Sequence, residues 1–321
     1  MTSPAVEVES LSRWFRAGKQ RVEALSRVSF QIEPGSIVAL LGANGAGKTT
    51  MAKILATLLL PSAGSARIFG HDVVREAAAC RRLASVVFGG ERGLYPQLSG
   101  RDNLRFFGML AGVNRREGRH RVPILLEQVG LSGAADRRVE TYSKGMKQRL
   151  HIAIGFLPRP QLLLLDEPTV GLDPLEAERL RGAIDQARQE GVSVLLTSHY
   201  LLDVERLADR VLLLDRGSIR EDLHLTDFIR RAGYAAVVTV RGSGCMPRLD
   251  DPPPGISLAN EPTGSGSGWE VTLRVQEWSP DVFAQLATLF ATSQVTDVQV
   301  REVRLEEAFA QAASQHSGSR G

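Results

Sequence analysis

The chain has 321 residues, a formal net charge of +3 and an apolar fraction of 43%. This length exceeds one average domain and predicts a large domain accompanied by a smaller one. The mild basic excess forms no basic stripe interleaved with aromatic residues, so we expect no nucleic-acid partner.

The two cysteines, Cys80 and Cys245, lie far apart, and neither belongs to a C-x-x-C motif. This pattern argues against a disulfide framework and a zinc site, and is typical of a reducing cytosol. Residues 1–4 do not begin a signal peptide. No apolar run approaches the roughly 18 residues that span a bilayer. We therefore expect any role at a membrane to depend on a partner.

The first predicted strands are residues 5–11 and 28–32, where apolar and polar residues alternate. Two aromatic residues, Trp14 and Phe15, follow the first strand among basic residues. An aromatic ring upstream of a phosphate-binding loop can stack on adenine. A place in the core or in a hairpin is the alternative.

A glycine-rich loop over residues 42–49 fits the phosphate-binding pattern G-x-x-x-x-G-K-[ST]. A strand-like apolar run precedes it and a helix-like run follows it, which is the context that the pattern requires. Its glycines allow the backbone to curl around an anion at a helix N-terminus. Lys48 would offer a charge to the β- and γ-phosphates, and Thr49 a hydroxyl to Mg²⁺. The predicted nucleotide-binding residues of this loop are Gly42, Ala43, Asn44, Gly45, Ala46, Gly47, Lys48, Thr49 and Thr50. The loop alone does not distinguish an ATPase from a GTPase or a kinase.

The segment after this loop predicts short strands at residues 66–70 and 84–88, with a helix at residues 74–83 between them. An apolar, aromatic patch lies within residues 93–107. From this patch to about residue 131 the pattern is helical, with turn signals at Gly112 and Gly118.

Ser143 precedes a helical apolar run at residues 150–157 and is a natural N-cap. This is a second helix N-terminus able to face an anion. Capping alone is the alternative role for Ser143.

Four consecutive leucines at residues 162–165 predict a strand buried on both faces of a parallel sheet. Asp166 and Glu167 follow at its carboxyl end, where α/β folds place ligand chemistry. Asp166 would hold Mg²⁺ directly or through water, and Glu167 would orient and polarise the attacking water. A solvated loop is the alternative for this pair.

The next predicted strand, residues 192–197, is followed by His199, and residues 211–217 form a strand and turn. At a strand end His199 can reach a γ-phosphate, and an ordinary hydrogen-bonding histidine is the alternative.

The composition shifts near Asp222, which predicts a large first domain over residues 1–222 and a small α+β accessory or regulatory domain over residues 223–321. In the second part we expect a mobile loop rich in Gly, Pro and Ser at residues 242–268. The predicted strands are residues 235–241, 269–275 and 295–303, and the predicted helices are residues 280–291 and 305–313.

Together these motifs resemble the ATP-binding subunit of an ABC transporter over roughly residues 5–220. Residues 42–49 match the Walker A loop and residues 162–167 the Walker B strand. Residues 142–146 look like the family signature in its Tyr-Ser-Lys-Gly-Met form, and residues 171–173 resemble the D-loop. His199 falls at the switch histidine, and Phe15, or else Trp14, at the adenine-stacking aromatic. The signature form and residues 303–309 are most similar to ABC-2-type exporters, such as the daunorubicin-resistance type.

The resemblance implies a P-loop NTPase fold, with a mainly parallel core sheet, an antiparallel β subdomain and a helical signature subdomain. It also implies a head-to-tail pair, formed with a second copy or a closely related ATPase subunit. Each ATP, with Mg²⁺, would lie between the Walker A loop of one subunit and Ser143 and Gly145 of the other.

The same resemblance implies that the chain would be the ATP-hydrolysing motor of an export complex at the cytoplasmic face of the cell membrane. It would drive efflux of a drug, lipid, polysaccharide or ion through a separate ABC-2-type permease, which would contact residues 93–107. The sequence does not indicate the cargo.

One departure concerns the glutamine that the family has after the strand ending near Phe88. Here Gly90 aligns with it and Glu91 is adjacent, so either Glu91 contacts Mg²⁺ or this loop serves coupling. Two alternative functions are a soluble ABC ATPase of translation or DNA repair, and a nucleotide-sensing regulator. The single cassette and the lack of sustained heptads between Lys48 and Ser143 disfavour the former, and an intact Glu167 and His199 the latter.

Overall fold

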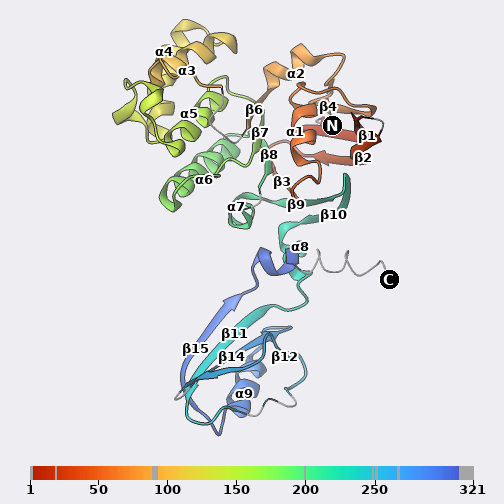
Figure 1. The fold of residues 1–321 in the computed structure, drawn as a ribbon, viewed down its shortest axis with the longest axis vertical. Coiled ribbons are helices and arrows are strands. Elements are labelled where there is room, and N and C mark those ends of the chain that lie inside the picture. Colours follow the sequence, from red (N-terminus) through yellow and green to blue (C-terminus); the bar gives the residue numbers. More distant parts are fainter. Residues whose placement is uncertain are drawn as a thin grey trace. The chain divides into compact units, whose positions relative to one another are not determined.

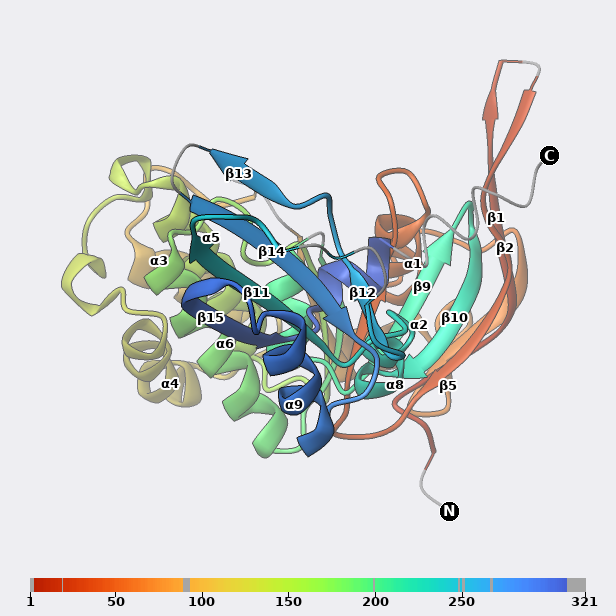
Figure 2. The same cartoon turned by 90° about the horizontal axis from the view of Figure 1, so that it is seen from below.

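The computed structural model describes residues 3–18, 20–88, 93–198, 200–247, 249, 252–265 and 268–310. The chain divides into two compact units, Met1–His224 and Leu225–Gly321 (Figures 1 and 2). Within the described ranges, no helix combines the length and the apolar character that crossing a bilayer requires.

The first unit is built on a six-stranded sheet in the order β10-β9-β3-β8-β7-β6. Its strands are β3 (Ile37–Leu41), β6 (Ala84–Phe88), β7 (Leu162–Asp166), β8 (Ser193–Thr197), β9 (Arg210–Asp215) and β10 (Ser218–His224). All pairs are parallel except β9 with β10. Every residue of β3, β7 and β8 is buried, which confirms the interpretation of the leucine run. β6 lies at the edge and is only partly buried.

Alternate leucines of β7 point to opposite faces of this sheet. Helices pack on both faces and bury these side chains. Leu162 and Leu164 share a core with residues of α1 (Lys48–Leu55). Leu163 and Leu165 share a different core with residues of α5 (Lys144–Phe156) and α6 (Pro174–Gln189). Figure 1 shows α1 on one side of the strands and α5 and α6 on the other. The short α7 (Leu201–Leu207) contributes Leu207 to this second core.

An antiparallel sheet in the order β2-β1-β4-β5 packs with the core that contains α1. It comprises β1 (Val6–Ala17), β2 (Gln20–Ile32), β4 (Ala63–Ile68) and β5 (His71–Asp72). The strands predicted at residues 5–11 and 28–32 were too short, because the hairpin continues through a charged stretch. Trp14 and Phe15 therefore lie within β1, paired with Glu23 and Val22.

A helical subdomain contains α3 (Gly100–Leu110), α4 (Arg115–Gln128) and part of α5, around its own apolar core. Two short 3₁₀ helices, Ser132–Ala134 and Val139–Thr141, connect α4 to α5, and α2 (Ala77–Leu83) precedes β6. The prediction of a turn at Gly118 was wrong. Asn114 caps α4 by accepting a hydrogen bond from the Glu117 N–H at 2.8 Å, so Gly118 continues the first turns of that helix.

The second unit contains a sheet in the order β12-β14-β11-β15, with β13 paired to β14. Its elements are α8 (Leu225–Arg230), β11 (Ala236–Ser243), β12 (Ile256–Leu258), β13 (Thr263–Ser265), β14 (Gly268–Val275), α9 (Pro280–Leu289) and β15 (Gln294–Glu302). Residues 305–310 are helical, and residues 311–313 of the helix predicted there lie outside the described residues.

The prediction of one continuous loop over residues 242–268 was wrong for the described residues that form strands, and the predicted mobility of the rest stays a prediction. β12 and β13 lie inside this segment, and Leu249 and Ile256 are buried in the core of the second unit. The high Gly and Pro content of the segment favoured a loop, so the sequence pattern did not indicate these two short strands. Residues 248, 250, 251, 266 and 267 lie outside the described residues.

Candidate nucleotide site

The glycine-rich loop connects β3 to α1, as its sequence context predicts. Gly45 and Gly47 have φ values of +82° and +113°, in the left-handed region that favours glycine. A Cβ on Gly47 would lie 2.4 Å from the Ala24 carbonyl oxygen and 2.8 Å from Leu25 Cδ2, whereas one on Gly45 would meet nothing within 4 Å. The loop therefore needs Gly47 for both conformation and space, because β2 lies directly against it.

Lys48 begins α1 and turns its side chain back over the loop. It is 6% exposed, and its Nζ donates hydrogen bonds to the carbonyl oxygens of Gly42 at 2.7 Å and Ala43 at 3.0 Å. These bonds use two of the three N–H donors of the ammonium group. Burial lowers the pKa of Lys48, while the charges of Glu167 and Asp166 oppose that shift. Lys48 is thus within electrostatic reach of both predicted carboxylates.

Asp166 lies at the carboxyl end of β7 and joins the loop to the sheet. Its Oδ2 accepts a hydrogen bond from Thr49 Oγ1 at 2.9 Å, and its Oδ1 accepts one from Thr197 Oγ1. Thr197 is the residue paired with Asp166 across the parallel strands β7 and β8. Sequence analysis did not single out Thr197, although the shared end of two parallel strands was a usable signal.

Glu167, the next residue, has a φ of +54°, which is uncommon for a residue other than glycine. Its backbone N–H donates to the Thr197 carbonyl oxygen at 2.9 Å, so β8 holds this conformation in place. Strained backbone of this kind is concentrated at functional sites.

Ser143 and Gly145 belong to the other side of the cassette. Ser143 caps α5, its hydroxyl accepting a hydrogen bond from the Met146 N–H at 3.1 Å. Gly145 is buried, and a Cβ there would lie 2.3 Å from Glu176 Oε2. Because α5 and α1 pack on opposite faces of the sheet, one chain does not bring Ser143 and Lys48 together.

The register of the β1–β2 hairpin favours Phe15 over Trp14 as the aromatic residue on the loop side. Arg13 pairs with Leu25, and the pairing shifts by one residue before Trp14. Arg13 stacks over the Phe15 ring at 4.6 Å, whereas Arg21 stacks over the Trp14 ring at 3.6 Å. Phe15 therefore shares a hairpin face with Leu25, which contacts the loop at Gly47, and it is 39% exposed.

A buried polar cluster that sequence analysis missed adjoins this site. Asp203 of α7 is 1% exposed and forms an ion pair with Arg181 of α6 at 2.7 Å. Its other oxygen accepts hydrogen bonds from the hydroxyls of Thr169 and, at 3.4 Å, Ser198. Thr169 lies two residues after Glu167, so the cluster ties the segment after β7 to the end of β8.

His199, Gly90 and Glu91 lie outside the described residues. The switch-histidine assignment and the two alternatives for the missing glutamine therefore remain predictions.

The donor set at this site suits a nucleotide with Mg²⁺. A threonine hydroxyl and a carboxylate are the hard oxygen ligands that Mg²⁺ prefers, and phosphate oxygens and water ordinarily complete its octahedron. Within the described part of the chain, no cluster of three or more His, Cys, Asp or Glu side chains could hold a metal by itself.

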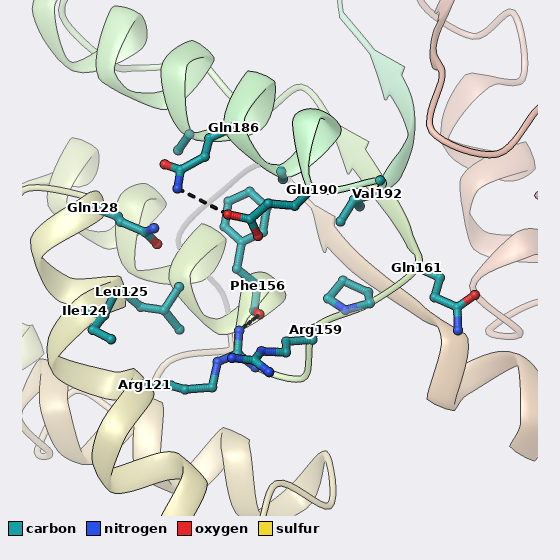
Figure 3. Close-up of a pocket in the computed structure, with 14 residues that line it drawn as sticks. Arg121, Ile124, Leu125, Gln128, Phe156, Arg159, Gln161, Gln186, Glu190 and Val192 are labelled. Carbon is teal, nitrogen blue, oxygen red and sulfur yellow. Dashed lines mark hydrogen bonds between the residues drawn. The ribbon is translucent and has the colours of Figure 1, made fainter.

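A separate pocket of about 390 Å³ lies between α4, α5 and α6 (Figure 3). Arg121 donates a hydrogen bond there to the Phe156 carbonyl oxygen at 3.0 Å, which satisfies the C-terminal end of α5. None of the predicted nucleotide-binding residues lines this pocket.

Comparisons with known proteins agree with this geometry. A family model described as ABC transporter matches residues 25–170. The doxorubicin resistance ATP-binding protein DrrA of Mycobacterium tuberculosis is 44% identical over 216 residues, which are 67% of this chain and 65% of that protein. The ABC transporter ATP-binding protein NatA of Bacillus subtilis is 39% identical, over 67% of this chain and 87% of that protein. The chain thus spans just under two thirds of the length of the doxorubicin-resistance relative.

Solved structures show the same fold. An ATP-binding subunit of an ABC transporter superposes with a TM-score of 0.65 at 32% identity, over 71% of this chain and 93% of that one. A dimeric ATP-binding cassette in a post-hydrolysis state with ADP and Pi superposes with a TM-score of 0.63 at 24% identity, over 68% of this chain and 98% of that one. The first unit is therefore a P-loop ABC cassette, and the chain belongs to the family of ABC transporter ATP-binding proteins.

Proposed function

We propose that this chain binds and hydrolyses ATP with Mg²⁺ and is the motor subunit of an ABC-2-type export complex. The observation that carries this proposal is the cluster at the end of β7, where Asp166 accepts a hydrogen bond from Thr49 while the neighbouring Lys48 folds over the glycine-rich loop. The loop from Gly42 to Thr50 would bind the phosphates through its backbone N–H groups and through Lys48.

Each residue of the cluster has a distinct role in the proposed reaction. Thr49 and Asp166 would hold Mg²⁺, which, when bound, offsets the charge that builds on the phosphate oxygens. Thr197 fixes the Asp166 carboxylate by donating to its other oxygen. Glu167 would accept a proton from the attacking water and orient it, and His199 would contact the γ-phosphate.

The separation of α1 and α5 within one chain supports a shared site. We propose that two cassettes pair head to tail, so that Ser143 and Gly145 of one face the phosphates bound by the other. Ser143 would offer its helix N-terminus to the anion, and Phe15 would stack on the adenine. The second cassette is either another copy of this chain or a closely related ATPase subunit.

The proposed place of action is supported by the relatives, several of which are named as drug-resistance ATP-binding proteins. We propose attachment to the cytoplasmic face of the cell membrane through a separate permease, and efflux of a drug, lipid, polysaccharide or ion. The second domain, taken as residues 223–321, would be an accessory domain, since it contains none of the proposed phosphate-binding residues.

The test is Glu167→Gln compared with Glu127→Gln, a matched change at an exposed position of α4. The Glu167 variant should bind ATP with Mg²⁺ but lose about 10²–10⁴-fold in turnover, because Gln keeps the shape without the base. It should also accumulate in the ATP-bound state with two cassettes paired, whereas the Glu127 variant behaves as the wild type. Wild-type turnover in the Glu167 variant would remove its catalytic role. A wild-type chain that binds ATP without hydrolysing it, even with its permease, would favour a nucleotide-sensing regulator.

A further inference from the structure

The strand β15 forms one edge of the sheet in the second unit and pairs on its inner side with β11. In the described part of the chain, no strand pairs with its outer edge. Figure 1 shows β15 at the rim of this sheet. With 9 residues it is longer than the usual strand, whereas exposed edge strands are normally short, interrupted or covered.

This edge carries exposed apolar side chains. Val295, Val298 and Val300 are 40%, 53% and 47% exposed. Val298 and Val300 pair with Val240 and Val238, which are buried in the core of this unit. Since paired residues share a face, the valines extend the apolar layer of the core beyond its edge.

The opposite face of β15 is polar, with an acidic residue on one side of its centre and a basic residue on the other. Asp297, Gln299 and Arg301 alternate with the valines and lie opposite Arg241, Thr239 and Val237 of β11. The charges of Asp297 and Arg301 are therefore of opposite sign and lie symmetrically about Gln299. A strand with this symmetry is complementary to an antiparallel copy of itself.

One register of two antiparallel β15 strands pairs opposite charges on one face and valines on the other. With Gln299 on the two-fold axis, Asp297 faces Arg301 of the second copy, and Val298 faces Val300 of the second copy. An axis through Val298 would place Val295 opposite Arg301, and one through Val300 would place Val298 opposite Glu302. Opposite charges and apolar pairs stabilise adjacent strands, so the axis through Gln299 is favoured.

We propose that two copies of this chain associate through antiparallel pairing of β15 with β15 about Gln299. The contact is isologous, as a closed two-fold dimer requires, and the backbone of each edge supplies the hydrogen bonds. It involves none of the nucleotide-binding residues, so it needs no ATP. It is therefore distinct from the head-to-tail contact of the cassettes and stands whether or not the proposed ATPase function does.

A disulfide tests the register. In a Cys245→Ser background, which removes the exposed native thiol, Gln299→Cys should cross-link two chains under mild oxidation without nucleotide and with EDTA. The two Cα atoms would be about 4.5–5.5 Å apart in an antiparallel pair, a separation that a disulfide spans. The matched control is Thr239→Cys, on the same face but one strand further in, at roughly 14 Å across three strand spacings. Equal cross-linking of both variants, or none at Gln299→Cys, would overturn the proposed pairing.

Charge reversal tests the complementarity. Asp297→Arg should oppose Arg301 of the second copy, and Arg301→Asp should oppose Asp297 of the second copy, so each variant alone should dissociate in sedimentation experiments. An equimolar mixture should form a heterodimer. The two introduced charges then face each other across the interface with opposite signs, and the native Arg301 of the first variant faces the native Asp297 of the second.

Each change also breaks an ion pair within the chain, Asp297 with Arg241 at 3.2 Å or Arg301 with Glu307 at 2.7 Å. Mixing cannot restore those internal pairs, so recovery on mixing would come from the interface alone. Circular dichroism checks that each variant is folded. A wild-type chain that remains monomeric without nucleotide at every concentration, or folded variants that fail to associate on mixing, would refute the proposal.

Discussion

Replacement of Gly47 by alanine tests how closely β2 constrains the glycine-rich loop. A left-handed backbone costs a residue with a Cβ about 1–2 kcal/mol. The added Cβ would also lie 2.4 Å from the Ala24 carbonyl oxygen, a backbone atom that can move only with β2. Such overpacking typically costs a further 1–3 kcal/mol or so. Gly47→Ala should therefore lower the free energy of unfolding of the first unit by about 2–5 kcal/mol.

Gly45→Ala is the matched control, since Gly45 also has a positive φ but an added Cβ there meets nothing within 4 Å. It should show only the backbone cost of about 1–2 kcal/mol. Urea denaturation followed by far-ultraviolet circular dichroism gives both values, with ATP affinity as a second measurement. Equal destabilisation by the two substitutions would show that β2 does not press on the loop and that our account of Gly47 is wrong.

Four further outcomes are expected. Lys48→Ala should abolish tight ATP binding in calorimetry with Mg²⁺, because it removes the ammonium group beside the loop, and unchanged affinity would contradict the phosphate role. Thr197→Val should destabilise the first unit by about 1.5–3 kcal/mol through loss of a hydrogen bond to a charged group, whereas Thr197→Ser keeps the hydroxyl and should retain turnover. Asp203→Asn should cost up to about 3–5 kcal/mol by removing the buried counter-ion of Arg181, which keeps only the more exposed Glu178 carboxylate at 3.0 Å, and a variant with unchanged stability would show that the cluster is not structural. Ile256→Asp should unfold the second unit but leave ATP affinity unchanged; if affinity fell in step, the two units would not fold independently.

The central fold was predictable from the sequence because its signals are local. A glycine pattern between an apolar strand and a helix specifies the loop, and four leucines before Asp166 specify a strand buried on both faces. These same residues determine where the site lies, since the loop and the carboxyl ends of β7 and β8 meet at one edge of a parallel sheet.

The sequence pattern that predicts a strand was weaker where the strand carries charged residues on its exposed face or lies in a glycine-rich segment. Residues 12–17 and 20–27 extend the β1–β2 hairpin, yet their exposed faces carry arginine and glutamate, so the apolar alternation that defines a strand is absent. Residues 256–258 and 263–265 form strands only because β14 offers them a partner, and Ile256 finds a place in the core. Tertiary pairing of this kind outweighs local propensity.

The contacts around the proposed site carboxylates, Asp166 and Glu167, were the least predictable, because they join residues distant in sequence. Thr197 reaches Asp166 across 31 positions, and Asp203 reaches Thr169 across 34. In sequence, Asp203 stands beside Val204 and near Leu207, on what becomes the buried side of α7. A carboxylate in that position costs stability unless it is paired, so an aspartate on an apolar helix face indicates a buried partner without identifying it. Only the packing of α6 against α7 identifies Arg181 as that partner. Through its bonds to Thr169 and Ser198, Asp203 also connects the segment after Glu167 to the end of β8.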